Sequence, residues 1–112
     1  MVIQDWSDKI IKAELTDDPE FTDELAALIE RLEGGEKKDV VLNLAQVKFL
    51  NSSNISRLLK LRKIAIDHQV QLCLCEIPVQ VWGVFLLTGL DGIFNVAEDT
   101  ASALASLQIN SH

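Results

Sequence analysis

The chain reads VVLNLAQVKFLNSSNISRLLKLRKIA over residues 40–65, and this stretch predicts a strand, a polar turn and a helix. Residues 39–44 are apolar and β-branched, as expected of a buried strand. After a short turn, Val47–Leu50 leads into Asn51–Asn54, whose four side chains are all of types that cap helix starts. We therefore expect a helix over residues 54–68. Its polar start follows a strand region, where parallel sheets commonly place binding sites.

Strands and helices alternate along the rest of the chain. In the first part of the chain, the residues predict a strand at 11–15, with residues 2–6 as its partner across a Ser7-Asp8 turn, and then a helix that Asp17-Asp18-Pro19 begins and Gly34-Gly35 ends. In the last part, they predict a strand at 70–77, a helix from Pro78 to near Gly89, a strand at 93–96 and a helix capped by Asp99-Thr100. Strands that alternate with helices run parallel and are joined by right-handed crossovers. The sequence therefore predicts an α/β fold with a mixed, mostly parallel sheet of about four to five strands and about four helices.

Length and composition indicate one globular domain. The chain has 112 residues, of which 48% are hydrophobic and 24% charged, close to the globular average. Its longest apolar run, Val81–Leu87, is far shorter than the ~20 residues that span a bilayer. The N-terminus has no signal-peptide pattern. We expect a single domain over residues 1–112, located in the cytoplasm, without direct membrane insertion.

Charge is distributed unevenly along the chain. The formal net charge is −7, with acidic segments at 1–39 and 76–112 and a net basic segment at 40–75. Because binding to nucleic-acid phosphates requires many Lys and Arg side chains, we expect no nucleic-acid partner. The basic segment favours an anionic surface on a partner.

Cys73 and Cys75 are the two cysteines of the chain, and both fall in the strand predicted at 70–77. Alternate residues of a strand share a face, and the CxC spacing differs from the CxxC of thioredoxin-like or zinc sites. We therefore expect buried, reduced thiols, with a redox or metal-binding role as the less favoured alternative. The sequence has no nucleophile–base pair, metal-ligand cluster or glycine-rich phosphate loop, so we expect no enzyme activity, cofactor or metal.

The stretch at 40–65 resembles the core of a STAS domain, the module of sulfate transporters and anti-sigma factor antagonists. Members of this family read as an apolar strand, a short turn, a second apolar stretch and then Asp-Ser-x-Gly-Leu at a helix start. The tail LLTGLDGIFNVAEDTASALASL, residues 86–107, is similar to the family's ending. The resemblance covers about residues 9–108 and implies a small α/β domain that recognises other proteins.

The resemblance also implies a regulatory cycle. Stand-alone members dock on an anti-sigma factor, which is often a serine kinase. Phosphorylation of a serine at the start of the member's second helix breaks this complex. A serine phosphatase removes the phosphate and restores binding. Ser53 matches that serine, and Ser52 is the less favoured alternative. The sequence departs from the family pattern at Asn51, in place of Asp, and at Asn54, in place of Gly.

An unswitched role is the alternative function. Some family members act as scaffolds or as soluble subunits of larger complexes, such as transporters or stress-signalling assemblies. In that case, Asn51, Ser52 and Ser53 serve only to cap the helix.

The helix at 54–68 also provides the predicted partner surface. At 100° per residue, one arc collects apolar side chains that we expect to face the core, namely Ile55, Leu58, Leu59, Ala65 and Ile66. Leu61 and Ile64 fall outside this arc, on the side of Arg57. We expect them to be the exposed apolar centre of a partner site whose polar members are Asn51, Ser52, Asn54, Arg57 and Lys60.

Overall fold

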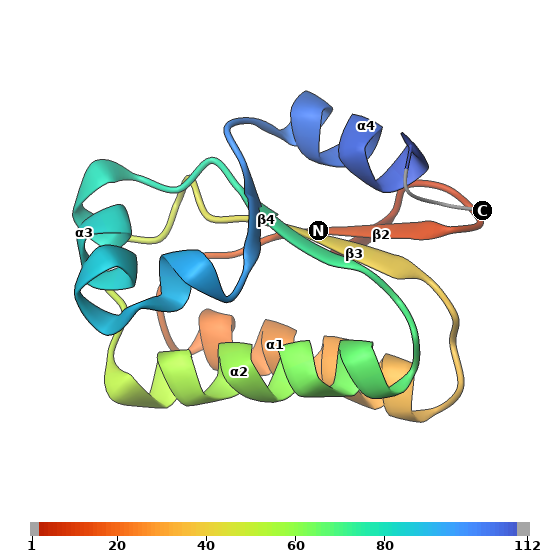
Figure 1. Cartoon of the computed structure of the whole chain (residues 1–112). Helices are drawn as coiled ribbons and strands as arrows, with labels where there is room; N and C mark the ends of the chain where they lie inside the picture. The colour runs from red at the N-terminus through yellow and green to blue at the C-terminus, as the bar shows by residue number, and fades with distance from the viewer. Residues whose placement is uncertain (1–2, 110–112) are drawn as a thin grey trace.

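The computed structural model describes residues 3–109, which fold as a sheet with helices on both of its faces (Figure 1). In chain order the elements are β1 (Ile3–Asp5), β2 (Ile10–Glu14), α1 (Glu20–Glu33), β3 (Asp39–Asn43), α2 (Ser52–Asp67), β4 (Leu72–Cys75), α3 (Val79–Thr88), the 3-10 turn η1 (Leu90–Gly92), β5 (Asn95–Ala97) and α4 (Thr100–Ile109).

The five strands form one sheet in the order β1-β2-β3-β4-β5. β1 pairs antiparallel with β2, and the other neighbouring pairs are all parallel. This arrangement confirms the predicted α/β fold with a mixed, mostly parallel sheet. The partner strand predicted at residues 2–6 is β1, although Val2 lies outside the described residues.

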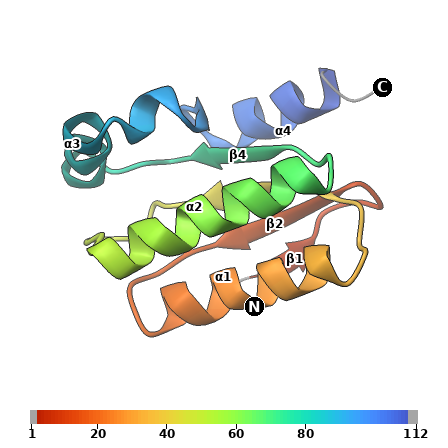
Figure 2. The same cartoon turned by 60° about the horizontal axis from the view of Figure 1, so that its bottom comes forward.

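The helices cover the two faces of the sheet unequally. α1 and α2 lie side by side on one face, while α4 lies on the other (Figures 1 and 2). The larger core fills the space between the sheet and α1 and α2, and its fully buried members include Phe21, Leu25, Leu28, Leu42, Leu58 and Leu61. The smaller core lies under α4 and consists of Ile10, Val41, Cys73, Cys75, Ala103 and Leu107.

Helix α2 presents a different face to the core from the one that the sequence predicted. Leu61 and Ile64 are only 0% and 8% exposed, so the prediction that they form an exposed apolar centre is wrong. Leu59 and Ile66, which were expected to face the core, are exposed instead. Two apolar arcs overlap at Leu58 and Ala65, and packing against both α1 and the sheet selects the arc that contains Leu61.

Helix α3 turns only some of its apolar side chains toward the core. α3 buries Val81 and Phe85, whereas Val79 and Leu86 are exposed and Trp82 is partly buried against the core. This helix is apolar on nearly every side, so its periodicity carries little information about which side faces inward. Within residues 3–109, no helix is both long and apolar enough to cross a membrane.

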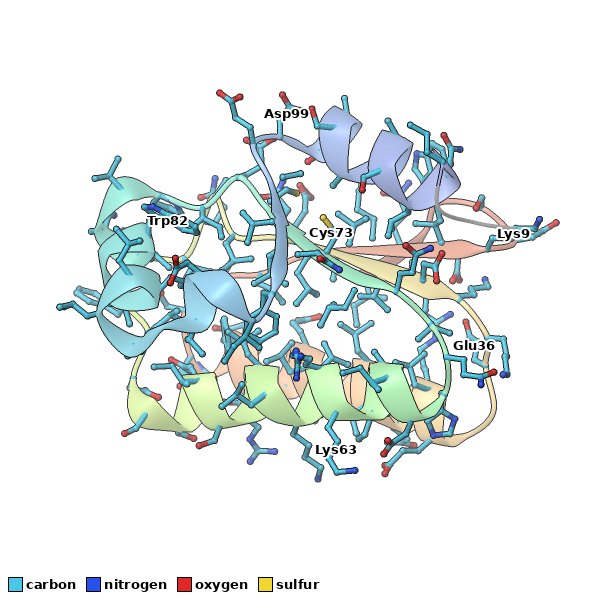
Figure 3. The ribbon with its side chains drawn as sticks, viewed as in Figure 1. Lys9, Glu36, Lys63, Cys73, Trp82 and Asp99 are labelled. Atoms are coloured by element: carbon cyan, nitrogen blue, oxygen red, sulfur yellow. The ribbon has the colours of Figure 1, made fainter. Side chains whose placement is uncertain are left out.

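The two cysteines are buried in β4, as the sequence predicted. The sulfur of Cys73 points into the smaller core under α4 (Figure 3), and Cys75 is fully buried beside Thr100, with 3.6 Å between Sγ and Oγ1. Burial raises the pKa of the Cys73 thiol to about 11, and the nearby Cys75 adds to this shift. Burial also raises the pKa of Cys75. Both groups are therefore protonated at neutral pH.

We predict that both thiols react slowly with a thiol reagent in the native protein at pH 7 and quickly in denaturant. A thiol reacts through its thiolate, and here both the raised pKa and burial keep the thiolate scarce. Stopped-flow labelling with a chromogenic disulfide measures the two rates. Rapid native labelling of either thiol would contradict a structural role.

Candidate functional site

The polar turn before α2 is held by two asparagines. Asn51 is the N-cap, and its side-chain oxygen accepts a hydrogen bond of 2.8 Å from the backbone N–H of Asn54. In return, the side-chain oxygen of Asn54 accepts one of 3.1 Å from the N–H of Asn51. The pair forms a capping box in which Asn54 plays the part usually taken by Glu or Gln.

The loop before α1 reaches across to this turn through two adjacent carboxylates. Asp18 accepts hydrogen bonds from the side-chain amides of Asn54, at 2.9 Å, and Asn51, at 3.4 Å. Asp17 accepts from the backbone N–H groups of Lys48 and Phe49, at 2.8 Å and 3.2 Å. Segments about thirty residues apart in the chain are therefore joined at one end of the sheet.

Asp18 contributes a negative charge to the turn. The pKa of its carboxyl is lowered mainly by a hydrogen bond from the Thr22 hydroxyl and, after that, by one from the Asn54 amide. The bonds that it accepts thus stabilise the fold above the ordinary pKa of an aspartate, and this contribution is lost as the pH falls through the lowered value. At neutral pH the carboxylate is charged, and it accepts hydrogen bonds from Asn51 and Asn54, which flank the two serines in the chain.

Asn54 is not available to a partner. It is only 3% exposed, and its side chain is occupied by Asn51 and Asp18. The prediction that Asn54 contacts a partner is therefore wrong. An asparagine here, where the family pattern has glycine, supplies both the reciprocal cap and the link to α1.

Ser52 and Ser53 are exposed at the first two positions of α2. Neither hydroxyl makes a hydrogen bond with any of residues 3–109, since the cap is made by Asn51 and Asn54. Their N–H groups belong to the first helical turn, which has no carbonyls of its own to accept them. Capping therefore does not account for either hydroxyl.

The surface beside the serines is basic and partly apolar. Arg57 is half-buried and Lys60 is exposed, one and two turns along α2 from Ser53. Phe49, in the loop before the turn, is 75% exposed. The exposed side chains of Val79 and Leu86 belong to α3, which lies at the same end of the molecule as the start of α2 (Figures 1 and 2).

The predicted site residues Asn51, Ser52, Ser53, Arg57 and Lys60 lie between the N-cap and the middle of α2. The sequence prediction did not include Asp17, Asp18 and Phe49. The Asp17-Asp18-Pro19 run was interpreted only as the start of α1. Asp18 does accept the backbone N–H of Thr22 in the first turn of α1, at 3.1 Å, but Asp17 and Asp18 also bind the turn before α2. The presence of two adjacent acids could have indicated a second contact, because a single helix start needs only one capping acid.

The fold and this turn define a small α/β domain that exposes a serine pair at a helix start beside basic and apolar side chains. The STAS domain model matches residues 18–103, and the chain belongs to the STAS domain family. This confirms the resemblance seen in the sequence.

One relative of the chain has a name that refers to anti-sigma factor antagonists. This chain is 33% identical to BtrV of Bordetella bronchiseptica, which is provisionally named an anti-sigma factor antagonist. The aligned 85 residues cover 76% of this chain and 70% of BtrV.

Solved structures share the fold at low sequence identity. The anti-sigma factor antagonist SpoIIAA in its unphosphorylated form superposes with a TM-score of 0.79 at 16% identity, covering 95% of this chain and 94% of that one. A variant of RsbS from Moorella thermoacetica gives 0.82 at 16% identity, over 97% and 95% of the two chains. The chain is thus a STAS domain similar to anti-sigma factor antagonists.

We predict that Asn51→Asp, which restores the family's acid, destabilises this protein at pH 7. Its carboxylate would stand where the Asn51 amide now lies, 3.4 Å from Asp18 Oδ2, and would replace a hydrogen bond by repulsion. The deficit in Tm should shrink below about pH 4, where carboxyl groups protonate. Thermal unfolding of both proteins from pH 3 to pH 8 measures it.

The control is a double-mutant cycle with Asp18→Asn. Asn51→Asp combined with Asp18→Asn should cost less than the sum of the two single changes, because the neutral amide at position 18 can again bond the new carboxylate. Strict additivity would mean that the two side chains do not interact.

Proposed function

We propose that this protein binds an anti-sigma factor that is also a serine kinase, through the start of α2. The docking surface comprises Asn51, Ser52, Ser53, Arg57 and Lys60, with Phe49 in place of Leu61 and Ile64 as its apolar member. The observation that supports this most directly is the pair of exposed serine hydroxyls that take no part in the helix cap.

The mixture of charge and apolar area suits a protein partner. Arg57 and Lys60 favour an acidic surface, and Phe49 offers a large aromatic side chain that a pocket can bury. Relatives named as anti-sigma factor antagonists provide the class of partner. In this proposal the domain acts by binding, and the kinase supplies the chemistry.

Phosphorylation of Ser53 switches the interaction off in this mechanism. A phosphate adds about −1.5 to −2 charges at a helix N-terminus, where the dipole and free N–H groups stabilise it. Arg57 lies four residues along α2, on the same side as Ser53, and can pair with the phosphate. The phosphate then neutralises a basic side chain of the docking surface and adds bulk at its centre, while the fold stays intact. A serine phosphatase reverses the change.

We predict that Ser53→Asp folds normally and binds its anti-sigma factor at least tenfold more weakly, which corresponds to about 1.4 kcal/mol. Ser53→Ala should bind like the parent protein, lose at most about 0.5 kcal/mol of stability because its hydroxyl has no partner, and resist phosphorylation. Titration calorimetry and mass spectrometry after incubation with kinase and ATP measure these effects. Ser52→Ala, which should still be phosphorylated, is the matched control.

Tight binding with no phosphate on either serine would contradict the switch. That outcome would support the alternative function of an unswitched scaffold or a subunit of a larger complex.

We predict that Arg57→Glu weakens binding to the anti-sigma factor about tenfold and reduces the salt dependence of the affinity, because it removes an attraction across the interface. Lys9→Glu is the matched control, since Lys9 is exposed at the opposite end of the molecule from α3 and the start of α2 (Figure 3). Thermal stability should change little in either variant. Equal losses of affinity in the two variants would point to a general charge effect and would rule out this surface.

A further inference from the structure

One edge of the sheet is open. β5 is the last strand in the order and pairs with β4, so the outer side of its backbone has no strand beside it within residues 3–109. Asn95 and Val96 are exposed, and in both views no helix of the described chain lies along that outer side (Figures 1 and 2). An open edge presents backbone donors and acceptors that can pair with another strand.

The two edges of the sheet differ in charge. The β1 edge contains Asp5, which forms ion pairs with Arg31 at 2.7 Å and Lys38 at 3.1 Å. Residues 93–97, in contrast, read Ile-Phe-Asn-Val-Ala and contain no charge. Charged side chains are a common means of preventing edge-to-edge pairing, so β1 is guarded against it and β5 is not.

Apolar side chains flank the open edge. Ile66 of α2, Ile93 and Val96 are 56%, 41% and 38% exposed. A hollow of about 340 Å³ between α2 and the start of β5 is lined in part by Ile66 and Ile93, and a second of about 210 Å³ by Trp82 and Val96. The edge therefore combines unpaired backbone with apolar area that a neighbour can cover.

Opposite charges lie at the two ends of this edge. Arg62 is at the beginning, where its Nε donates to the carbonyl oxygen of Ile93 at 3.3 Å, and it forms no ion pair within residues 3–109. The exposed acids Glu98 and Asp99 are at the end, with Asp99 at the start of α4 (Figure 3). One edge thus has a basic end and an acidic end.

We propose that two copies of this chain associate through antiparallel pairing of their β5 strands. Antiparallel pairing about a two-fold axis places the basic end of each strand beside the acidic end of the other, so both pairs of charges attract. A self-complementary edge of this kind favours a second copy over an unrelated strand. The result is a continuous sheet that crosses the dimer.

The alternation of side chains limits the register. Directly opposed residues in an antiparallel pair point to the same face, so Val96 faces either its own copy or Phe94 of the other chain. The first register centres the pairing on Val96 and the second on Asn95, both within the strand Asn95–Ala97. Both bring Arg62 toward the acidic pair and cover Ile93 and Val96.

The β5 edge is separate from the proposed docking surface. That surface lies at the start of α2, whereas the paired edge involves β5 and the second half of α2. A dimer of this kind leaves Ser53 of each copy exposed to solvent.

Sedimentation velocity of the full chain at concentrations from about 1 μM to about 1 mM tests the proposal across the range of weak association. We expect a concentration-dependent dimer that Val96→Lys abolishes, because two lysines would face or flank each other at the seam. Gln4→Lys places the same charge on the exposed β1 edge and should leave the dimer unchanged. A monomer at every concentration, or a dimer that Val96→Lys leaves intact, would overturn the proposal.

A charge exchange provides a second test that does not depend on the fold of the lysine variant. Arg62→Glu and Glu98→Arg should each weaken dimerisation at least tenfold, and the two changes together should restore it. Restoration is expected only if the side chains meet, and a double variant as weak as the single ones would overturn the proposed pairing. Circular dichroism confirms in each case that the monomer is folded.

Discussion

The rotation of helix α2 about its own axis is the constraint on which the site depends. Leu58, Leu61 and Ala65 are buried against the sheet and α1, and each leucine contributes about 1.5–3 kcal/mol through burial. Turning the helix by one residue, about 100°, would move all of these side chains away from the core. Asn54 lies on the same line as these residues, one turn before Leu58, so the same packing directs it inward.

Asn54 meets Asp18 because of this rotation. The buried amide needs hydrogen-bond partners, and the capping box together with Asp18 supplies them. Ser53, Arg57 and Lys60 occupy the neighbouring line along the helix, so they emerge together on the surface. An interior constraint therefore determines which serine hydroxyl and which bases a partner can reach, and it explains why this chain keeps a neutral Asn51 beside the Asp18 carboxylate.

The two faces and the two edges of the sheet have different roles. One face carries the larger core and ends in the polar turn before α2, while the other carries only the small core under α4. The β1 edge contains Asp5, which is tied to α1 through Arg31 and to the segment before β3 through Lys38. The β5 edge, whose strand residues carry no charge, is left as the open side of the domain. The proposed docking surface and the edge proposed to pair with a second copy therefore lie on separate parts of the surface.

The sequence by itself determined the class of fold, the order of the elements, the capped start of α2 and the burial of the cysteines, because these follow from local patterns. Alternating strands and helices specify a parallel sheet, and the Asn51–Asn54 cluster specifies a helix start whatever surrounds it. Only the tertiary structure decided which arc of α2 faces inward, since Leu58 and Ala65 belong to both candidate arcs. Only the tertiary structure also brought Asp17 and Asp18 to the turn and left Phe49 exposed beside it. The contacts of Asp17 and Asp18 join residues about thirty positions apart in the chain. The periodicity of side chains along the sequence does not indicate which distant loops come together when the sheet packs.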